Sequence, residues 1–86
     1  MQVELLVTDD CPACEKAAAV WRAACTAAGA ELAVRNLGEP ETLQLARRWR
    51  LGTVPAVIID GELMAVGVQD DAQARSLLEI AATRTT

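Results

Sequence analysis

The sequence predicts an α/β fold, a four-stranded mixed β-sheet flanked by three helices in the order β-α-β-α-β-β-α. Short segments rich in β-branched and leucine residues alternate with longer segments whose apolar residues recur at helical spacing. An Asp60-Gly61 pair, which favours a tight hairpin, separates the last two strand segments. Strands joined through helices pair in parallel, and a hairpin adds an antiparallel neighbour, so the sheet should be mixed. We expect the 86 residues to form one domain, 1–86.

The first third of the chain predicts a strand followed by a long helix. Val3–Thr8 has the composition of a buried strand. Pro12 suits the first position of a helix, where its missing N–H would be unpaired anyway, and Gly29 is a typical residue to end one. We therefore expect a helix over about Pro12–Ala28. Its apolar face should comprise Cys14, Ala18, Trp21, Cys25 and Ala28.

The middle of the chain predicts a second strand and a second helix. Glu31–Leu37 alternates partially between apolar and polar residues, as in a half-buried strand. Glu39-Pro40-Glu41 places acidic groups at the positive end of a helix dipole, and the helix should continue to about Arg50. A loop over Leu51–Val54 should follow. The apolar residues of this helix are Leu43, Leu45, Ala46 and Trp49.

The last third predicts a hairpin and a closing helix. Ala56–Ile59 and Leu63–Val66 flank the Asp60-Gly61 pair as two strands, and Gly67 ends the second. Either Asp70 or Asp71 should cap the final helix, because short side chains with an oxygen acceptor bind the free amides of a first turn. The predicted buried face of that helix is Ala74, Leu77, Leu78 and Ala81.

Composition excludes several classes of function. The chain has no histidine, so a Ser-His-Asp triad or a histidine-ligated metal cannot form within it. Its net charge of −4, without a basic run, argues against a nucleic-acid partner. No apolar stretch is long enough to span a membrane, and the N-terminal segment resembles a strand rather than a signal peptide. We expect a monomer in the cytoplasm, where three cysteines are not a disulfide scaffold.

Two cysteines in the segment Cys11-Pro12-Ala13-Cys14 carry the most specific chemical signal. A cysteine at a helix N-terminus meets unpaired amides and the positive end of the helix dipole, which stabilise its thiolate. Thiolate is the nucleophile in disulfide exchange. The spacing lets Cys14 reach Cys11 and close a disulfide. The expected chemistry is attack by Cys11 on a substrate disulfide, followed by displacement of the reduced product by Cys14.

The same pair could instead be half of a metal site. Zinc normally takes four ligands, and only Cys25 remains to join the pair, so one chain cannot supply four cysteines. Two chains could hold a metal or an iron–sulfur cluster with four thiolates. A dimeric metal or iron–sulfur carrier is therefore the alternative hypothesis. Cys25, Trp21 and Trp49 are interpreted as core residues.

The order of motifs resembles the thioredoxin superfamily over nearly the whole chain. A strand leads into Cys11-Pro12-Ala13-Cys14, Thr53-Val54-Pro55 follows two elements later, and a hairpin and a helix close the chain. The resemblance is closest to small glutaredoxin-like or thioredoxin-like redox-active disulfide proteins. It implies a thioredoxin-like fold and a thiol–disulfide oxidoreductase with Cys11 and Cys14 as catalytic residues. It also implies a cis Pro55 beside the dithiol, and a Val54 backbone that pairs with substrate.

The resemblance further implies which residues contact the substrate. Gly67-Val68-Gln69-Asp70-Asp71 resembles the segment with which glutaredoxins hold glutathione, although Val68 replaces a glycine. The implied substrate-binding residues are Pro12, Ala13, Thr53, Val54, Pro55, Gly67 and Asp70. No cofactor or metal is expected, and the partners should be disulfide-containing proteins.

The electron donor remains open between glutathione and a flavin-dependent reductase. Asp9-Asp10 stand where glutaredoxins carry a basic residue, and their carboxylates would repel those of glutathione. Arg47, Arg48 and Arg50 form the one basic cluster. It suits a solvated helix end, and Arg50 could also meet an acidic partner or a glutathione carboxylate.

Overall fold

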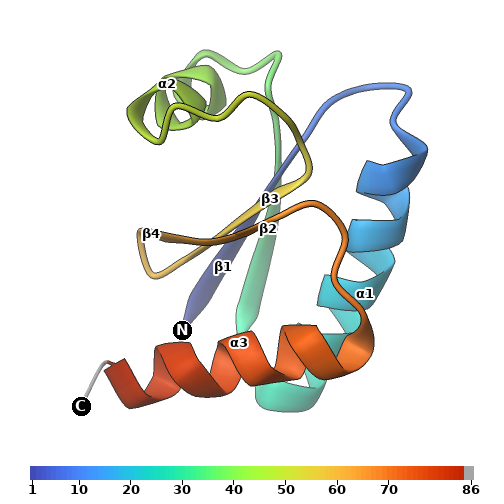
Figure 1. Cartoon of the computed structure of the whole chain (residues 1–86), viewed down its shortest axis with the longest axis vertical. Coiled ribbons are helices and arrows are strands. Elements are labelled where there is room, and N and C mark those ends of the chain that lie inside the picture. Colours follow the sequence, from blue (N-terminus) through green and yellow to red (C-terminus); the bar gives the residue numbers. More distant parts are fainter. Residues whose placement is uncertain (85–86) are drawn as a thin grey trace.

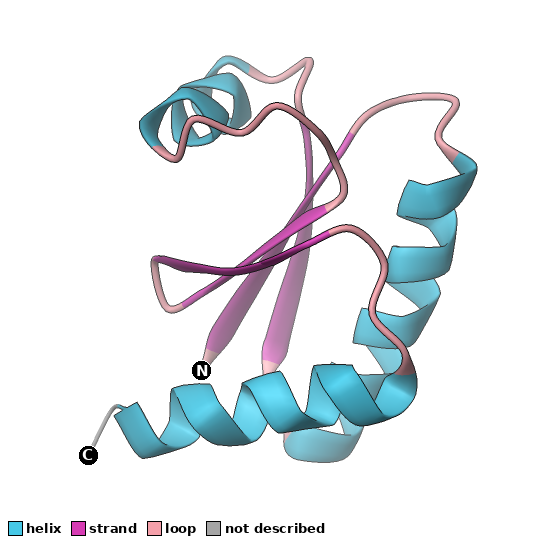
Figure 2. Cartoon of the chain, viewed as in Figure 1, coloured by secondary structure: helices cyan, strands magenta, loops and turns pink. Residues whose placement is uncertain are grey.

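The helices and strands follow one another in the predicted order (Figures 1 and 2) in a computed structural model that describes residues 1–84. The strands are β1 (Gln2–Val7), β2 (Glu31–Asn36), β3 (Ala56–Ile59) and β4 (Glu62–Val66). The helices are α1 (Pro12–Ala28), α2 (Pro40–Arg48) and α3 (Asp71–Arg84). The predicted α/β fold is confirmed.

The four strands form one mixed sheet in the order β2-β1-β3-β4. β1 pairs in parallel with β2, with Val3 opposite Leu32, and antiparallel with β3, with Leu6 opposite Ala56. β3 and β4 form the antiparallel hairpin, whose register shifts by an irregularity between Val57 and Ile58. The ends of β1 and β2 and the start of β3 consequently meet at one edge of the sheet.

Several element boundaries differ by one or two residues from the sequence predictions. β1 ends at Val7 rather than Thr8, because the chain then enters a turn in which Asp10 has a φ of 52°. α2 ends at Arg48 rather than Arg50, whose left-handed φ of 52° cannot continue the helix. β2 ends one residue early, before Leu37, and β4 begins one residue early, at Glu62.

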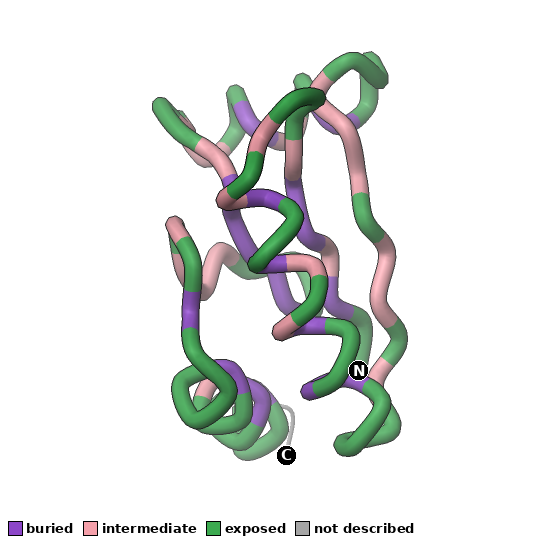
Figure 3. The backbone as a smooth tube through the Cα atoms, turned by 90° about the vertical axis from the view of Figure 1, so that its right-hand side faces the viewer, coloured by how far each residue is buried: buried purple, intermediate pink, exposed green. Residues whose placement is uncertain are grey.

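The sheet separates two apolar layers, and Figure 3 shows that buried residues gather where helices face it. Because side chains alternate across a strand, Val3 and Leu5 of β1 face α1 and α3, whereas Leu6 faces α2. Figure 1 shows α2 alone on its side, with α1 and α3 packed together on the other. Trp21 is the largest side chain of the α1–α3 layer and is completely buried.

Some predicted core positions were wrong. Ala28 of α1 is exposed, and Ala17 and Ala24 are buried, because the face of α1 that meets both the sheet and α3 is rotated from the predicted stripe. On α2, for which the sequence predicted no buried face, Leu43 is 40% exposed and Thr42 is completely buried. α2 is short and meets the sheet along a narrow stripe, so its flank remains in solvent.

A buried hydrogen bond joins α1 to the segment before α3. The Trp21 indole Nε1 donates to Gln69 Oε1 at 3.1 Å, and Gln69 Nε2 donates to the Val66 carbonyl at 3.4 Å. Gln69 is only 8% exposed. A buried indole N–H needs a partner, since leaving it unpaired costs the desolvation of that group. Gln69 therefore fixes how the chain enters α3 against α1.

We predict that Gln69→Ala lowers the free energy of unfolding by about 1–3 kcal/mol, because it leaves the Trp21 N–H buried and unpaired. Urea unfolding followed by far-ultraviolet circular dichroism measures this loss. Val68→Ala is the matched control, since Val68 is the adjacent residue and is 45% exposed. Equal unfolding midpoints for the two variants would contradict the role assigned to Gln69.

Candidate active site

Cys11 occupies the N-cap position of α1, directly after the turn that ends β1. Its backbone is extended, with φ −123° and ψ 98°, and its Sγ accepts a hydrogen bond from the Cys14 backbone N–H at 3.1 Å. Pro12 then starts the helix. The sulfur thus takes the place that a Ser or Asp oxygen usually has in a cap, and it lies at the positive end of the helix dipole.

Cys11 and Cys14 form a disulfide whose Cα atoms are 5.2 Å apart. The two residues differ in exposure, because Cys11 precedes the helix whereas Cys14 lies on its inner face. Cys11 is half-buried and Cys14 is only 3% exposed. Between them, Pro12 is exposed and Ala13 half-buried. Cys11 is therefore the more accessible end of the pair.

The Thr53-Val54-Pro55 segment approaches the same edge of the sheet. The Val54–Pro55 peptide bond is cis. Pro55 is buried and comes directly before Ala56, which pairs with Leu6 near the end of β1 that leads to Cys11. Thr53 is exposed, and Val54 is half-buried against the apolar layer under α2. The fold thus brings the two sequence motifs to one end of the sheet.

The predicted glutathione-like segment reaches this edge only through its first residue. Gly67, with a φ of +90°, donates its N–H to the Pro55 carbonyl at 2.8 Å. Asp70 instead caps α3: its Oδ1 accepts from the Gln73 N–H at 2.8 Å, and its own N–H donates to Gln73 Oε1 at 2.9 Å. This reciprocal pair is a capping box, so Asp70, not Asp71, is the cap.

A shallow depression surrounds the disulfide. Its lining consists of ten residues from the end of β1, the turn, the first turns of α1 and the end of β2: Val7, Thr8, Asp9, Asp10, Cys11, Cys14, Glu15, Ala18, Val34 and Asn36. Asn36 Nδ2 donates to Asp9 Oδ1 at 2.8 Å, and Asn36 Oδ1 accepts from the Gly38 N–H at 2.8 Å. The turn before Cys11 is therefore held against the end of β2.

Sequence reasoning missed Val34 and Asn36 as site residues. Both lie near the carboxyl end of β2, the parallel neighbour of β1. A signal was present, because the carboxyl ends of adjacent parallel strands meet at one edge of the sheet. The last residues of β2 could therefore have been expected beside the end of β1 and the cysteine that follows it.

Cys25 lies in the apolar layer between the sheet, α1 and α3, and is 2% exposed. Burial raises the pKa of its thiol above the usual value, because the apolar surroundings disfavour the charged form.

Trp21 is fully buried, as predicted, whereas Trp49 is only half-buried. Within residues 1–84, no three His, Cys, Asp or Glu side chains cluster as a metal site.

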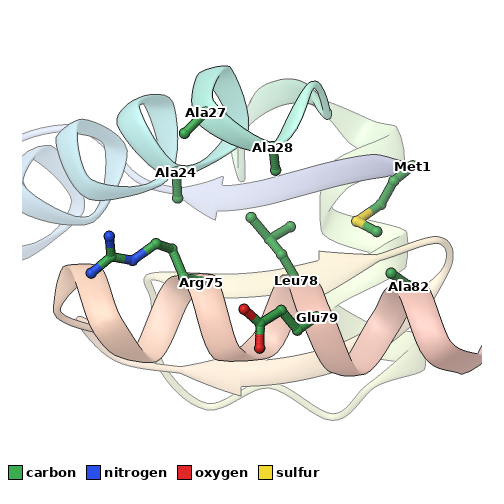
Figure 4. A pocket seen from close by; sticks show the side chains of 8 residues that line it. All are labelled: Met1, Ala24, Ala27, Ala28, Arg75, Leu78, Glu79 and Ala82. Atoms are coloured by element: carbon green, nitrogen blue, oxygen red, sulfur yellow. The ribbon is translucent and has the colours of Figure 1, made fainter.

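A second depression lies at the opposite end of the sheet, between α1, α3 and Met1 (Figure 4). The alanines of α1 and Leu78 of α3 form its apolar walls, and Arg75 and Glu79 stand on its rim. It contains no cysteine and does not reach the disulfide. Among the described residues, no helix is long and apolar enough to cross a membrane.

A mixed sheet with a disulfide at the start of its first helix defines a redox-active disulfide protein. The chain belongs to the thioredoxin domain family, whose model matches residues 1–79. No curated protein matches the sequence significantly.

Solved structures share the fold at low sequence identity. Thioredoxin 1 from the thermophilic eubacterium Thermosipho africanus has a TM-score of 0.73 at 16% identity, over 99% of this chain and 98% of that one. A malarial protein has a TM-score of 0.71 at 16% identity, over 93% and 94%. A mutant of a thioredoxin-like protein has a TM-score of 0.63 at 20% identity, over 88% and 97%.

We predict that Cys25→Ala lowers the free energy of unfolding by about 1 kcal/mol through the lost buried volume, while disulfide reduction stays near the wild-type rate. Urea unfolding and a turnover assay measure the two quantities. Loss of turnover at unchanged stability would show that Cys25 takes part in the chemistry.

The raised pKa of Cys25 also predicts a pH dependence. As pH rises, the Cys25 thiol ionises in the unfolded chain before it ionises in the folded protein. Its contribution to the free energy of unfolding is therefore fully present below the unfolded pKa of about 8.5 and is lost as pH rises through the folded pKa. In a Cys11→Ser/Cys14→Ser background, where Cys25 is the sole thiol, unfolding midpoints should fall above about pH 8.5. Adding Cys25→Ala should remove that fall. The chain has no tyrosine to mask the effect.

Proposed function

We propose that this protein is a thiol–disulfide oxidoreductase that reduces disulfides in partner proteins. One observation carries the proposal: Cys11 caps α1 with its sulfur, is half-exposed, and is bonded to a Cys14 that is almost fully covered. The amide that donates to the Cys11 sulfur would stabilise a thiolate at the same place. The covered sulfur is then left to complete the exchange.

The reaction balances with two thiols and one substrate disulfide. The Cys11 thiolate attacks one sulfur of the substrate, a mixed disulfide forms, and the first substrate thiolate leaves and takes up a proton. Cys14 loses its proton and attacks the Cys11 sulfur, which releases the second substrate thiol. Two electrons pass to the substrate and the Cys11–Cys14 bond forms. Of the two protons on the product thiols, one comes from Cys14 and the other from solution, to which Cys11 lost its own proton on ionising.

Several neighbouring residues support substrate contact at this edge. Thr53 is exposed and Val54 half-exposed directly before Pro55, and Gly67 holds the Pro55 carbonyl from the other side. We assign the substrate-facing surface to Pro12, Ala13, Thr53, Val54, Pro55 and Gly67. Asp70 stays in this group as well, because the cap of α3 uses only its Oδ1 atom and the side chain is exposed.

We propose that the protein acts in the reducing cytoplasm, where an electron donor must reduce its disulfide after each turnover. A reductase or glutathione can return the disulfide to the dithiol. The test couples reduction of a protein disulfide to NADPH consumption, once with a thioredoxin reductase and once with glutathione plus its reductase. Turnover in either arm supports the proposal. No turnover in both, together with a protein that purifies with bound metal or cluster, would instead favour a dimeric carrier.

We predict opposite outcomes for the two single cysteine variants. Cys11→Ser should abolish both reduction and mixed-disulfide formation, because the accessible sulfur is gone. Cys14→Ser should still attack but cannot resolve, so it should accumulate covalent adducts with substrate proteins. Mass spectrometry of each variant after incubation with an oxidised substrate reads the adducts directly. Adducts on Cys11→Ser but not on Cys14→Ser would reverse the assigned roles.

A further inference from the structure

The depression around Cys11 carries three carboxylates and no basic side chain. Asp9, Asp10 and Glu15 line it, and its other residues are uncharged. Lys16 follows Glu15 but does not line the depression, nor do Arg47, Arg48 and Arg50. The depression does not include the substrate-facing residues assigned above. It borders Cys11 on the side of β2, and the only charged side chains on that side are carboxylates.

No neighbouring positive charge neutralises these carboxylates within residues 1–84. The N-cap hydrogen bond of α1 is made by the Cys11 sulfur, so neither Asp9 nor Asp10 serves as the cap. Asp9 accepts one hydrogen bond, from the uncharged Asn36 amide, which fixes its position without neutralising it. Asp10 and Glu15 are exposed, and within residues 1–84 none of the three carboxylates forms an ion pair.

We propose that the acidic rim of this depression selects disulfides flanked by positively charged side chains. The proposal rests on the proposed function and names its substrate class: partner proteins with Lys or Arg close to the reactive cysteine. Asp9, Asp10 and Glu15 act as specificity-determining residues, because charge of one sign around a cleft raises the local concentration of ligands of the other sign. The same rim disfavours glutathione, which carries two carboxylates and one ammonium group.

The covalent step is the one given above, and the rim changes only the rate of encounter and of formation of the mixed disulfide. Association steered by charge commonly gains a factor of about 10–1000 at low salt. Small exposed probes belong at the lower end of that range, so we expect about tenfold here. Salt should remove the effect, since the Debye length falls from about 10 Å at 0.1 M to about 3 Å at 1 M.

The experiment compares three model disulfides with the reduced protein. Cystamine carries two ammonium groups, hydroxyethyl disulfide is neutral, and dithiodipropionate carries two carboxylates. The second-order rate of each is measured for the wild type and for Asp9→Asn/Asp10→Asn/Glu15→Gln. Dividing variant by wild-type rates cancels the intrinsic reactivity of each disulfide. The neutral compound reports any change in the nucleophilicity of Cys11 itself.

A matched control variant changes net charge equally at the other end of the sheet. Glu31→Gln/Glu62→Gln/Glu79→Gln removes three exposed carboxylates, which lie at the start of β2, at the start of β4 and in α3 on the rim of the second depression. If net charge alone mattered, this control would behave like the variant of the rim. A local effect confines the change to the rim variant.

At low salt, and relative to the neutral disulfide, the rim variant should react with cystamine about tenfold more slowly than the wild type and with dithiodipropionate faster. The control variant should change neither rate by more than about twofold. In the wild type, 1 M salt should reproduce the loss without any substitution. Reaction with the neutral disulfide but no charge preference, or equal effects of the two variants, would overturn this proposal and leave the proposed function standing. No reaction with any disulfide would overturn both.

Discussion

β1 pairs in parallel with β2 and antiparallel with β3. The carboxyl ends of β1 and β2 and the start of β3 therefore lie together at one end of the sheet. The end of β1 leads to Cys11, the end of β2 carries Asn36, and the start of β3 follows Pro55. A slip of one residue in either pairing would turn Leu5 and Leu6 to the wrong faces, which bury different apolar layers. The cores that fix this register therefore also fix the site.

The start of α1 combines a structural and a chemical role in one atom. Every helix leaves amides unpaired at its first turn, and here the Cys11 sulfur accepts one of them. The group that completes the helix is thus also the group that the dipole prepares for disulfide exchange. Cys14 lies one turn further along on the inner face of α1 and is buried. The two sulfurs thus have the same chemistry and differ in exposure.

The linings of the two depressions differ in charge. At the dithiol end, carboxylates surround the redox pair without a cationic partner among the lining residues. At the opposite end, Arg84 of α3 pairs with Glu62 of β4 at 2.6 Å, and Arg75 stands beside Glu79 on the rim of the second depression. The acidic rim is therefore a local feature of the depression around the disulfide, and in the proposal above it adds selectivity to disulfide exchange.

Local signals in the sequence determined the order of elements, the start of α1 at Pro12 and the redox pair. Each depends on residues close together in the chain: a strand period, a proline at the first helical position, two cysteines one turn apart. Tertiary structure decided that Thr42 is buried while Leu43 is not, that Gln69 pairs with Trp21, and that Asn36 holds Asp9. Those outcomes depend on how helices sit against the sheet and on partners 48 and 27 residues apart. Periodicity gives a helix a face, but only packing sets which rotation of that face meets the core.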